Sequence, residues 1–440
     1  MENKLSSAGK DAALLTALGA VESLLAFLYR VALSRLAGAQ VMGLYQLVMP
    51  VYAVFLSVTA VGFTAATANL SARHLALNNS LGADQTLHTA LKWVFLLLLP
   101  AGAVLIAGSD FISTALLGDA RTQLGLILVV PCVALTAIEN LHKHFFYGAG
   151  IVCPPAVVEL LEQFVRAAAV IALLVHYLPQ WPERAVGLIL WGMIFCELFS
   201  SCSLVWLYRR RFSGAGLSGS GEDREVRRAR ILAIAVPVGL NSLLGNLLSA
   251  ANAALIPRQL AAGGMGREEA VASFGVLCGM TMPMLSLPTV FLGALTLVLG
   301  PRLARASALG RAKELRRLCG KALWITAVLA LPSLTLMMAA GPRLGRLLFR
   351  QEVGDYLCPL AAVTAMSCFA SVLACALNST GHHPAVTAIS LLGGTVQLVF
   401  TAVLTPLPSV GLGGYVIGAL VSTGLELFLC WRKAGKFGLL

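Results

Sequence analysis

Charged residues are scarce in this sequence. Only 12% of its 440 residues are Asp, Glu, Lys or Arg, whereas 58% are hydrophobic and the mean hydropathy is +0.83. About 25% of the residues of an average soluble protein are charged, so a soluble domain of this length would carry roughly twice as many. The composition excludes a soluble globular protein and predicts an all-α polytopic membrane protein.

The sequence also lacks the short motifs that hold nucleotides or build common hydrolytic sites. It has no P-loop, no dinucleotide fingerprint in a strand–turn–helix context, no HExxH and no GxSxG. We therefore expect that the chain is not an enzyme, has no catalytic residues and does not hydrolyse ATP. The energy for any transport would come from an ion gradient, the membrane potential or substrate supply. A coupling ion, either a proton or Na⁺, is the only cofactor that this leaves open.

The sequence also lacks cysteines at the spacing of redox or metal-binding motifs. No two cysteines have CxxC spacing, and no His/Cys cluster has the spacing of a zinc site. The ten cysteines are scattered singly, mostly within apolar stretches, where free cysteine usually behaves as a small hydrophobic residue. The sequence therefore predicts no metal site.

Twelve apolar stretches are long enough to cross a bilayer as helices, which takes about 20 residues each. The first follows a short polar lead without a cleavage site, so we expect a retained helix and not a signal peptide. The stretches cover residues 11–37, 41–70, 90–108, 123–147, 156–178, 185–208, 230–256, 271–299, 321–341, 356–377, 384–405 and 411–431.

Lys and Arg gather in alternate connections between these stretches. With the N-terminus inside, the inner segments hold 22 of the 32 Lys and Arg residues, Lys143 among them, and the outer loops hold seven. By the positive-inside rule, this distribution predicts that both termini are cytoplasmic. The same alternation argues against nucleic acid as a partner, although the net charge is +12.

The two halves of the chain have matching sequence patterns. Glu197-Leu198-Phe199 matches Glu426-Leu427-Phe428, and Pro155-Ala156-Val157 matches Pro384-Ala385-Val386, in both cases 229 residues apart. Residues 209–229 are basic at both ends and rich in Gly and Ser in the middle, which is typical of a flexible linker. We predict a six-helix lobe at 1–208, a cytoplasmic linker at 209–229 and a second six-helix lobe at 230–440. Their shared topology implies a symmetry axis along the membrane normal.

The first predicted span carries three charges where a lipid-facing helix would carry none. The segment Ala20–Arg35 contains Glu22, Arg30 and Arg35. A charged side chain at the bilayer centre costs about 2.5–3.5 kcal/mol on insertion scales, so it normally faces a partner or a water-filled cavity. We expect this helix to line a central polar cavity, while snorkelling to the interface is an equally good interpretation of Arg35.

The fifth predicted span is the second charged stretch. Glu159, Glu162 and Arg166 lie at i, i+3 and i+7 and share one helix face. Glu162 and Arg166 also form an i,i+4 pair in the favourable order. Such a face is too polar for lipid and should point inward. Three polar residues from other spans complete the predicted cavity lining: Glu139, Glu197 and Asn241.

Pro50 and Pro283 lie within the second and eighth predicted spans, at corresponding places in the two halves. Proline removes a backbone hydrogen bond and permits a bend in a membrane helix. We therefore predict hinges at both positions, with a plain packing kink as the alternative.

Several of these segments resemble one known family. Phe27–Gly38, Gly43–Ala72, Pro155–Arg166, Cys196-Glu197-Leu198 and Leu285–Ala304 are similar to the stage V sporulation protein B family. That family belongs to the multidrug/oligosaccharidyl-lipid/polysaccharide exporter superfamily. The resemblance extends along nearly the whole chain and is strongest in the first six spans.

The resemblance implies a MATE-like fold, with about 12 transmembrane helices in two six-helix lobes around a central cavity, working by alternating access. It implies a bacterial plasma membrane and a polyprenyl-diphosphate-linked sugar as cargo, with the peptidoglycan precursor lipid II as the leading candidate. The family's conserved cations correspond to Arg30 and Arg35, and its motif in the fifth span corresponds to Glu162 and Arg166. Arginine suits this cargo because it can bind phosphate oxygens in a bidentate way.

Three hypotheses follow for the function. The leading one is a flippase for a lipid-linked oligosaccharide in cell-wall or polysaccharide synthesis or in sporulation. It would act as a monomer among membrane lipids, with cell-wall synthesis proteins as candidate partners. The second is a proton- or sodium-coupled multidrug exporter of the same fold, which the buried carboxylates would suit. The third is a scaffold for a cell-wall or spore-coat assembly, which the long inner linker would suit.

Overall fold

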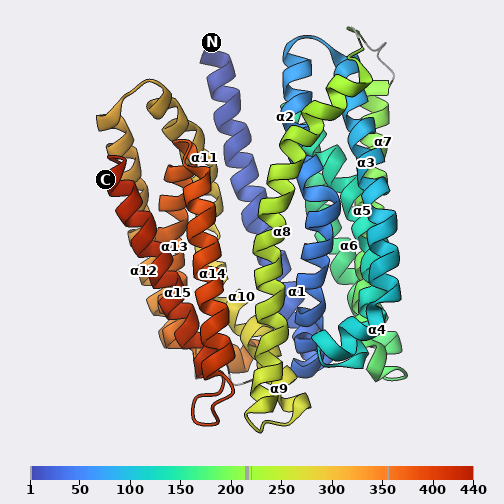
Figure 1. Cartoon of the computed structure of the whole chain (residues 1–440), viewed down its shortest axis with the longest axis vertical. Helices are drawn as coiled ribbons and strands as arrows, with labels where there is room; N and C mark the ends of the chain where they lie inside the picture. Colours follow the sequence, from blue (N-terminus) through green and yellow to red (C-terminus); the bar gives the residue numbers. More distant parts are fainter. Residues whose placement is uncertain (1, 214–217, 220, 352, 354–355, 440) are drawn as a thin grey trace. The chain divides into compact units, whose positions relative to one another are not determined.

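The structure is a computed structural model in which every regular element of the described chain is a helix (Figure 1). It describes residues 2–213, 218–219, 221–351, 353 and 356–439, without the side chains of residues 2–17, 213, 294 and 297. The predicted all-α fold class is therefore confirmed. The longer helices are α1 (Glu2–Leu56), α2 (Gly62–Ala76), α3 (Ser80–Ala107), α5 (Gln123–Gly148), α6 (Cys153–Tyr177), α7 (Ala185–Tyr208), α8 (Arg224–Ala262), α11 (Phe291–Ala308), α12 (Ala312–Phe349), α13 (Leu357–Ser379), α14 (His383–Leu404) and α15 (Gly413–Lys436). The shorter ones are α4 (Ser109–Phe111), α9 (Arg267–Phe274) and α10 (Met282–Ser286).

Ten helical segments of the described chain are long and apolar enough to cross a membrane. The first of them, Leu18–Ala76, has 59 residues and would extend about 88 Å at 1.5 Å per residue, enough for two crossings of a core of about 30 Å. Helix α6 is outside these ten but has 25 residues, which is a full span length. Each of the twelve predicted spans therefore falls on helix.

Gly38 divides the first two predicted spans. Its backbone has φ 78° and ψ 173°, within an otherwise continuous α1. Glycine adopts positive φ without the steric penalty that a Cβ would impose. The chain therefore changes direction here, between residues 37 and 41, where the sequence predicted one span to end and the next to begin.

The chain folds as two compact units. Unit 1 comprises Met1–Leu25 and Leu47–Ala250, and unit 2 comprises Ala26–Gln46 and Ala251–Leu440. These units differ from the predicted lobes, because the middle of α1 packs with unit 2 and the first two-thirds of α8 packs with unit 1. The predicted lobes, 1–208 and 230–440, are based on matching sequence patterns in the two halves. The compact units do not test that duplication, so the lobes stay a prediction.

Close helix packing holds unit 1 together. Small buried residues allow it, since apolar side chains gain little by leaving lipid and membrane helices associate mainly through van der Waals packing. Gly192 of α7 is one such contact: a Cβ there would lie 2.9 Å from Val170 Cα of α6. Aromatic rings fill the space farther along, with Phe145 of α5 edge-on to Tyr208 of α7 at 5.0 Å between centroids. Helices α5, α6 and α7 thus form a tight three-helix wall.

Close helix packing at small residues also holds unit 2 together. A Cβ on Gly275 would lie 2.6 Å from the backbone nitrogen of Gly43, so the middle of α1 packs closely on the start of the eighth span. Polar groups inside the unit are satisfied internally. The Gln397 amide of α14 donates to the Tyr415 carbonyl at 3.0 Å and accepts from the Ser422 hydroxyl of α15 at 2.9 Å.

Replacing Gly192 with leucine should separate α6 from α7, because the backbone of Val170 leaves no room for a side chain. Overpacking of this kind costs about 1–3 kcal/mol. We expect a lower melting temperature in detergent by differential scanning fluorimetry. Gly245→Leu on α8 is the matched control, since nothing lies within 4 Å of a Cβ there. Equal melting temperatures for the two variants would show that the α6–α7 contact is looser than described.

Candidate functional site

Seven ionisable side chains of unit 1 form two neighbouring groups, one around Arg166 and one around Lys143, which meet where Glu139 lies against Glu197. We call the seven together the charge cluster. They come from the first part of α1 and from α5, α6 and α7. Three of its carboxylates, on Glu139, Glu162 and Glu197, are only 3–4% exposed. The cluster consists of Glu22, Glu139, Lys143, Glu159, Glu162, Arg166 and Glu197.

Arg166 holds one end of the charge cluster. Its Nη2 group forms an ion pair with Glu162 Oε1 and lies 3.8 Å from Glu197 Oε1. Its Nε donates to Cys196 Sγ at 3.4 Å, and its Nη1 donates to Gln163 Oε1 at 3.5 Å. The pairing of Glu162 with Arg166 that the i,i+4 spacing predicted is present, and Glu197 joins it from the neighbouring helix α7.

Lys143 holds the other end. Its Nζ lies 2.9 Å from Glu159 Oε1 and 3.4 Å from Glu139 Oε1. Tyr147, one turn farther along α5, donates to the second oxygen of Glu159 at 3.3 Å. The arrangement repeats that of Arg166, because one cation from one helix is shared between a carboxylate of its own helix and one of the next.

Gln163 connects α1 to this group. Its side-chain amide donates to Glu22 Oε1 at 3.4 Å, while its carbonyl oxygen accepts from Arg166. Glu22 therefore reaches the guanidinium through one neutral side chain. The sequence predicted that Glu22 and the charged face of the fifth span would border one polar region, and the structure brings them together.

The charge cluster is unbalanced, with five carboxylates against two cations. Glu197 Oε2 is fully buried and has no hydrogen-bond partner among the described residues. A buried ion without a partner is strongly unfavourable, and the usual remedies are a bound proton or a bound cation. The excess carboxylates can therefore bind and release protons or small cations. Arg166 can also replace one of its carboxylate partners with another acceptor.

Three side chains of the cluster region have the spacing of a metal site. Ligand atoms of Glu162, Cys196 and Glu197 all lie within 4.8 Å of one another. Arg166 contacts all three of these side chains, however. Because the guanidinium already supplies the positive charge between them, we assign no metal to this place.

The two predicted cations of α1 belong to unit 2 and have different environments. Arg35 donates from Nε to the Leu348 carbonyl at 2.7 Å and from Nη2 to the Leu347 carbonyl at 2.5 Å. These are unpaired carbonyls at the C-terminal end of α12, where a cation is favourable, so Arg35 caps that helix. Arg30 is half-buried and has no hydrogen-bond or ion-pair partner among the described residues. Of the two, Arg30 remains available to a ligand.

Asn241 and the two prolines complete the predicted residues. Asn241 is exposed on α8, whereas Asn246 on the same helix donates to Ser57 Oγ at 2.6 Å. Pro50 lies inside α1, seven residues before the π-helical segment Ser57–Val61. Pro283 lies two residues after the π-helical segment Gly275–Thr281. Such segments interrupt the regular hydrogen bonding near both predicted hinges.

Two residues that contact the charge cluster, Gln163 and Cys196, were not predicted from the sequence. Lys143 was predicted to be a cation of an inner segment between the spans. In the structure the Lys143 side chain is only 13% exposed and pairs with Glu139 and Glu159. The i,i+4 spacing of Glu139 and Lys143 was a signal for this pair. Gln163 and Cys196 carried no comparable signal, because their roles depend on contacts between helices.

A sequence profile of the family described as "Polysaccharide biosynthesis protein" matches residues 8–307. Stage V sporulation protein B of Bacillus subtilis (strain 168) is 22% identical over 430 residues, which cover 95% of this chain and 81% of that protein. Sporulation protein YkvU of the same organism is 22% identical over 240 residues, which cover 53% of this chain and 52% of that protein. These relatives confirm the resemblance that the sequence segments indicated.

Solved structures of transporters share the fold. A multidrug resistance MATE family transporter of the MOP superfamily, in an inward-facing conformation, has a TM-score of 0.76 and 15% identity over 94% of this chain and 95% of that one. A MOP superfamily transporter from Pyrococcus furiosus has a TM-score of 0.68 and 16% identity over 97% and 96%. These similarities confirm the MATE-like fold and agree with the expectation that the chain is not an enzyme. The chain is thus a multi-pass membrane protein that belongs to the polysaccharide biosynthesis protein family and has the fold of MOP superfamily transporters.

Proposed function

We propose that this protein is a flippase that moves a polyprenyl-diphosphate-linked oligosaccharide across the membrane by alternating access, with lipid II as the leading candidate. Membership of the polysaccharide biosynthesis protein family supports this proposal, as does the similarity to stage V sporulation protein B over 95% of the chain. The proposed setting is a bacterial plasma membrane, with both termini cytoplasmic and the protein acting as a monomer. Cell-wall synthesis proteins would supply or receive the lipid.

One observation carries the proposal: a guanidinium is held among carboxylates inside a membrane-spanning bundle. Arg166 is bound by Glu162, Glu197 and Gln163, and its side chain is still 23% exposed. A diphosphate offers the same kind of oxygens as the two carboxylates and carries more charge, so it can replace them as the partner of Arg166. Arg30, which has no partner in the described chain, is a second cation for the same kind of ligand.

The excess of carboxylates can couple the binding of phosphate by Arg166 to the binding of an ion. When Glu162 or Glu197 takes up a proton or pairs with Na⁺, its hold on Arg166 weakens and the guanidinium becomes available to phosphate. When the ion leaves, the carboxylate competes again and the phosphate is released. A proton or Na⁺ is therefore the proposed coupling ion, and the charge cluster is its proposed site.

A second candidate is a proton- or sodium-coupled exporter of amphipathic cationic drugs. The excess of five carboxylates over two cations in the charge cluster favours it, since carboxylates bind cationic substrates directly. The two functions differ in the charge of the cargo. The flippase needs Arg166 as a ligand for phosphate, whereas the exporter needs Arg166 only to keep its neighbouring carboxylates paired.

Complementation tests the proposal in cells. Expression of this protein should restore growth to a bacterium depleted of its own lipid II flippase, because the cargo would again reach the outer leaflet. Membrane insertion is checked by immunoblot of the membrane fraction. Normal insertion without rescue, combined with drug efflux that collapses with the proton or sodium gradient, would favour the exporter.

Arg166 and Glu162 give a sharper test in purified protein. Glu162→Gln should bind undecaprenyl diphosphate at least as tightly as the wild type, since it removes a competitor for the guanidinium. Arg166→Gln in that background should weaken binding about 10- to 100-fold, the value of a charged hydrogen bond of about 1.5–3 kcal/mol. The double variant removes the Glu162–Arg166 pair together but leaves the buried Glu197 without its guanidinium, so the melting temperatures of both variants are measured before their affinities are compared. Equal affinity of the two variants in microscale thermophoresis would remove Arg166 from the binding site.

Arg30 and Arg35 should respond differently to the same change. Arg30→Gln should reduce growth rescue with little change in melting temperature, because the described structure gives Arg30 no partner to lose. Arg35→Gln should destabilise the protein by about 1 kcal/mol, because it loses two hydrogen bonds to the end of α12. Each variant is measured for rescue and for melting temperature. A lower melting temperature for Arg30→Gln, together with lost rescue at unchanged stability for Arg35→Gln, would show that Arg35 and not Arg30 binds the ligand.

A further inference from the structure

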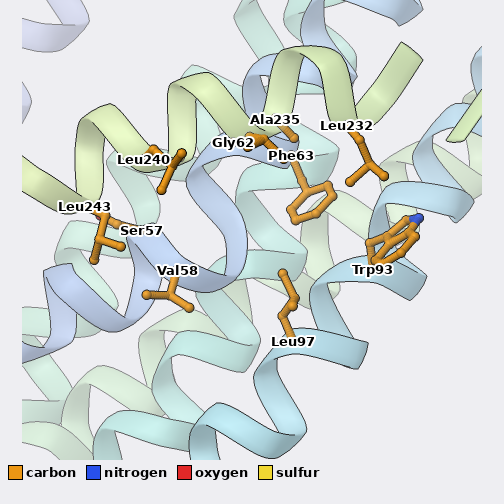
Figure 2. Close-up of a pocket in the computed structure, with 12 residues that line it drawn as sticks. Ser57, Val58, Gly62, Phe63, Trp93, Leu97, Leu232, Ala235, Leu240 and Leu243 are labelled. Atoms are coloured by element: carbon orange, nitrogen blue, oxygen red, sulfur yellow. The ribbon is translucent and has the colours of Figure 1, made fainter. Parts of the chain in front are cut away.

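An apolar groove lies in unit 1 between α3, α8 and the π-helical segment Ser57–Val61 with the start of α2 (Figure 2). Its volume is about 310 Å³. Trp93 and Leu232 lie at one end of it, and Val58 and Leu243 at the other. Ser57 contributes a hydroxyl, but that group is occupied by the Ala53 carbonyl, Ser242 and Asn246. The wall of the groove is therefore chemically apolar.

One face of α8 forms the length of the groove. Its lining residues follow the i, i+3, i+4 spacing of a single helix face. Only 11% of the apolar window of α8 is buried, so most of this helix is exposed in the described structure. The face extends from Leu232 to Leu243, or about 16 Å, which is about half of a hydrocarbon core of about 30 Å. The groove thus has the length of one leaflet. The lining residues of α8 are Leu232, Ala235, Val236, Gly239, Leu240 and Leu243.

Basic residues surround the end of the groove at Trp93. Lys92 precedes Trp93 on α3, and Arg228 lies one turn before Leu232 on α8; both are exposed and have no partner among the described residues. Arg227 joins the two helices at this level by donating to Thr89 at 3.0 Å. The surrounding turns hold five cations against three carboxylates: Lys92, Arg224, Arg227, Arg228 and Arg230 against Glu222, Asp223 and Glu225. This end, which we call the basic mouth, is net positive.

We propose that this groove binds the polyprenyl chain of the lipid-linked saccharide, with Lys92 and Arg228 of the basic mouth facing its diphosphate. The inference rests on the proposed function and names the place where the lipid part of that substrate is held. A groove one leaflet long with cations at one end matches a lipid with an anionic head and a hydrocarbon chain. A single groove fits the one chain of a polyprenyl lipid better than the two chains of a glycerophospholipid.

Photocrosslinking in nanodiscs tests the proposal without requiring transport. The probe is geranylgeranyl diphosphate with a diazirine on its last isoprene unit, and labelled peptides are mapped by mass spectrometry. We expect label on the α3 and α8 segments of the groove. An excess of undecaprenyl diphosphate should remove it, whereas an equal excess of phosphatidylglycerol should not. Equal competition by phosphatidylglycerol, or label spread over all lipid-facing helices, would overturn the proposal.

Two variants of α8 form a matched pair for the groove. Gly239→Leu fills it, since a Cβ at Gly239 has only ordinary contacts, the nearest 3.6 Å away at the Ser57 carbonyl. Gly245→Leu adds the same side chain where nothing lies within 4 Å. Labelling should fall about tenfold or more in the first, because an occupied groove excludes several methylene groups, and should persist in the second. Equal labelling of both variants would place the chain elsewhere.

The basic mouth is tested with two ligands. Lys92→Gln with Arg228→Gln should weaken labelling by the diphosphate probe about 30-fold, the equivalent of about 1 kcal/mol for each of the two cations near a membrane surface. Labelling by the corresponding uncharged alcohol probe should not change. An equal loss with both probes would show that these residues act on the fold of the groove and not on the head group. Specific labelling in a protein that fails to rescue growth would keep the groove and reject the flippase function.

Discussion

The structure depends on the cost of placing charge inside an apolar, membrane-spanning bundle. Within unit 1, the seven ionisable groups of the charge cluster lie among helices that otherwise pack through small and apolar side chains. Each cation is shared between two carboxylates from adjacent helices, Lys143 between Glu139 and Glu159 and Arg166 between Glu162 and Glu197. This sharing fixes α5, α6 and α7 to one another, because breaking either group would leave a buried ion unpaired. It also leaves a surplus of negative charge, which a static scaffold would have no reason to keep.

The excess of carboxylates over cations is the reason that we propose the charge cluster as a transport site and not only as a structural contact between helices. A guanidinium that has more acceptors than it needs can change partners at low cost, and a carboxylate that loses its partner must take up an ion. The charge cluster and the apolar groove then have complementary roles within unit 1. The cluster offers Arg166 to the diphosphate in the proposed transport site, whereas the groove is a separate place that holds the chain while the diphosphate faces Lys92 and Arg228. A polyprenyl-diphosphate sugar has both a diphosphate and a long hydrocarbon chain, whereas an amphipathic cationic drug has an apolar part but no phosphate.

Much of the fold could be predicted from the sequence, because it depends on local properties. Apolar stretches gave the twelve spans, Gly38 separates the first two where the pattern predicted a break, and i,i+4 spacing gave the pair of Glu162 and Arg166. The features that could not be predicted depend on contacts between distant segments. Arg35 caps a helix end more than 300 residues away, and Lys143 pairs with Glu159 across two helices. The groove is also of this kind, since its walls come from three separate parts of the chain.

The most direct measurement of the central claim is translocation by the purified protein. Proteoliposomes are prepared with fluorescent lipid II in both leaflets, and the fraction that an external quencher such as dithionite can reach is followed with time. The account predicts that the wild-type protein makes nearly all of the lipid accessible, and that liposomes without protein stop at about half, the share of one leaflet in a bilayer. An accessible fraction that stays at about half, with correctly inserted and folded protein, would contradict the account.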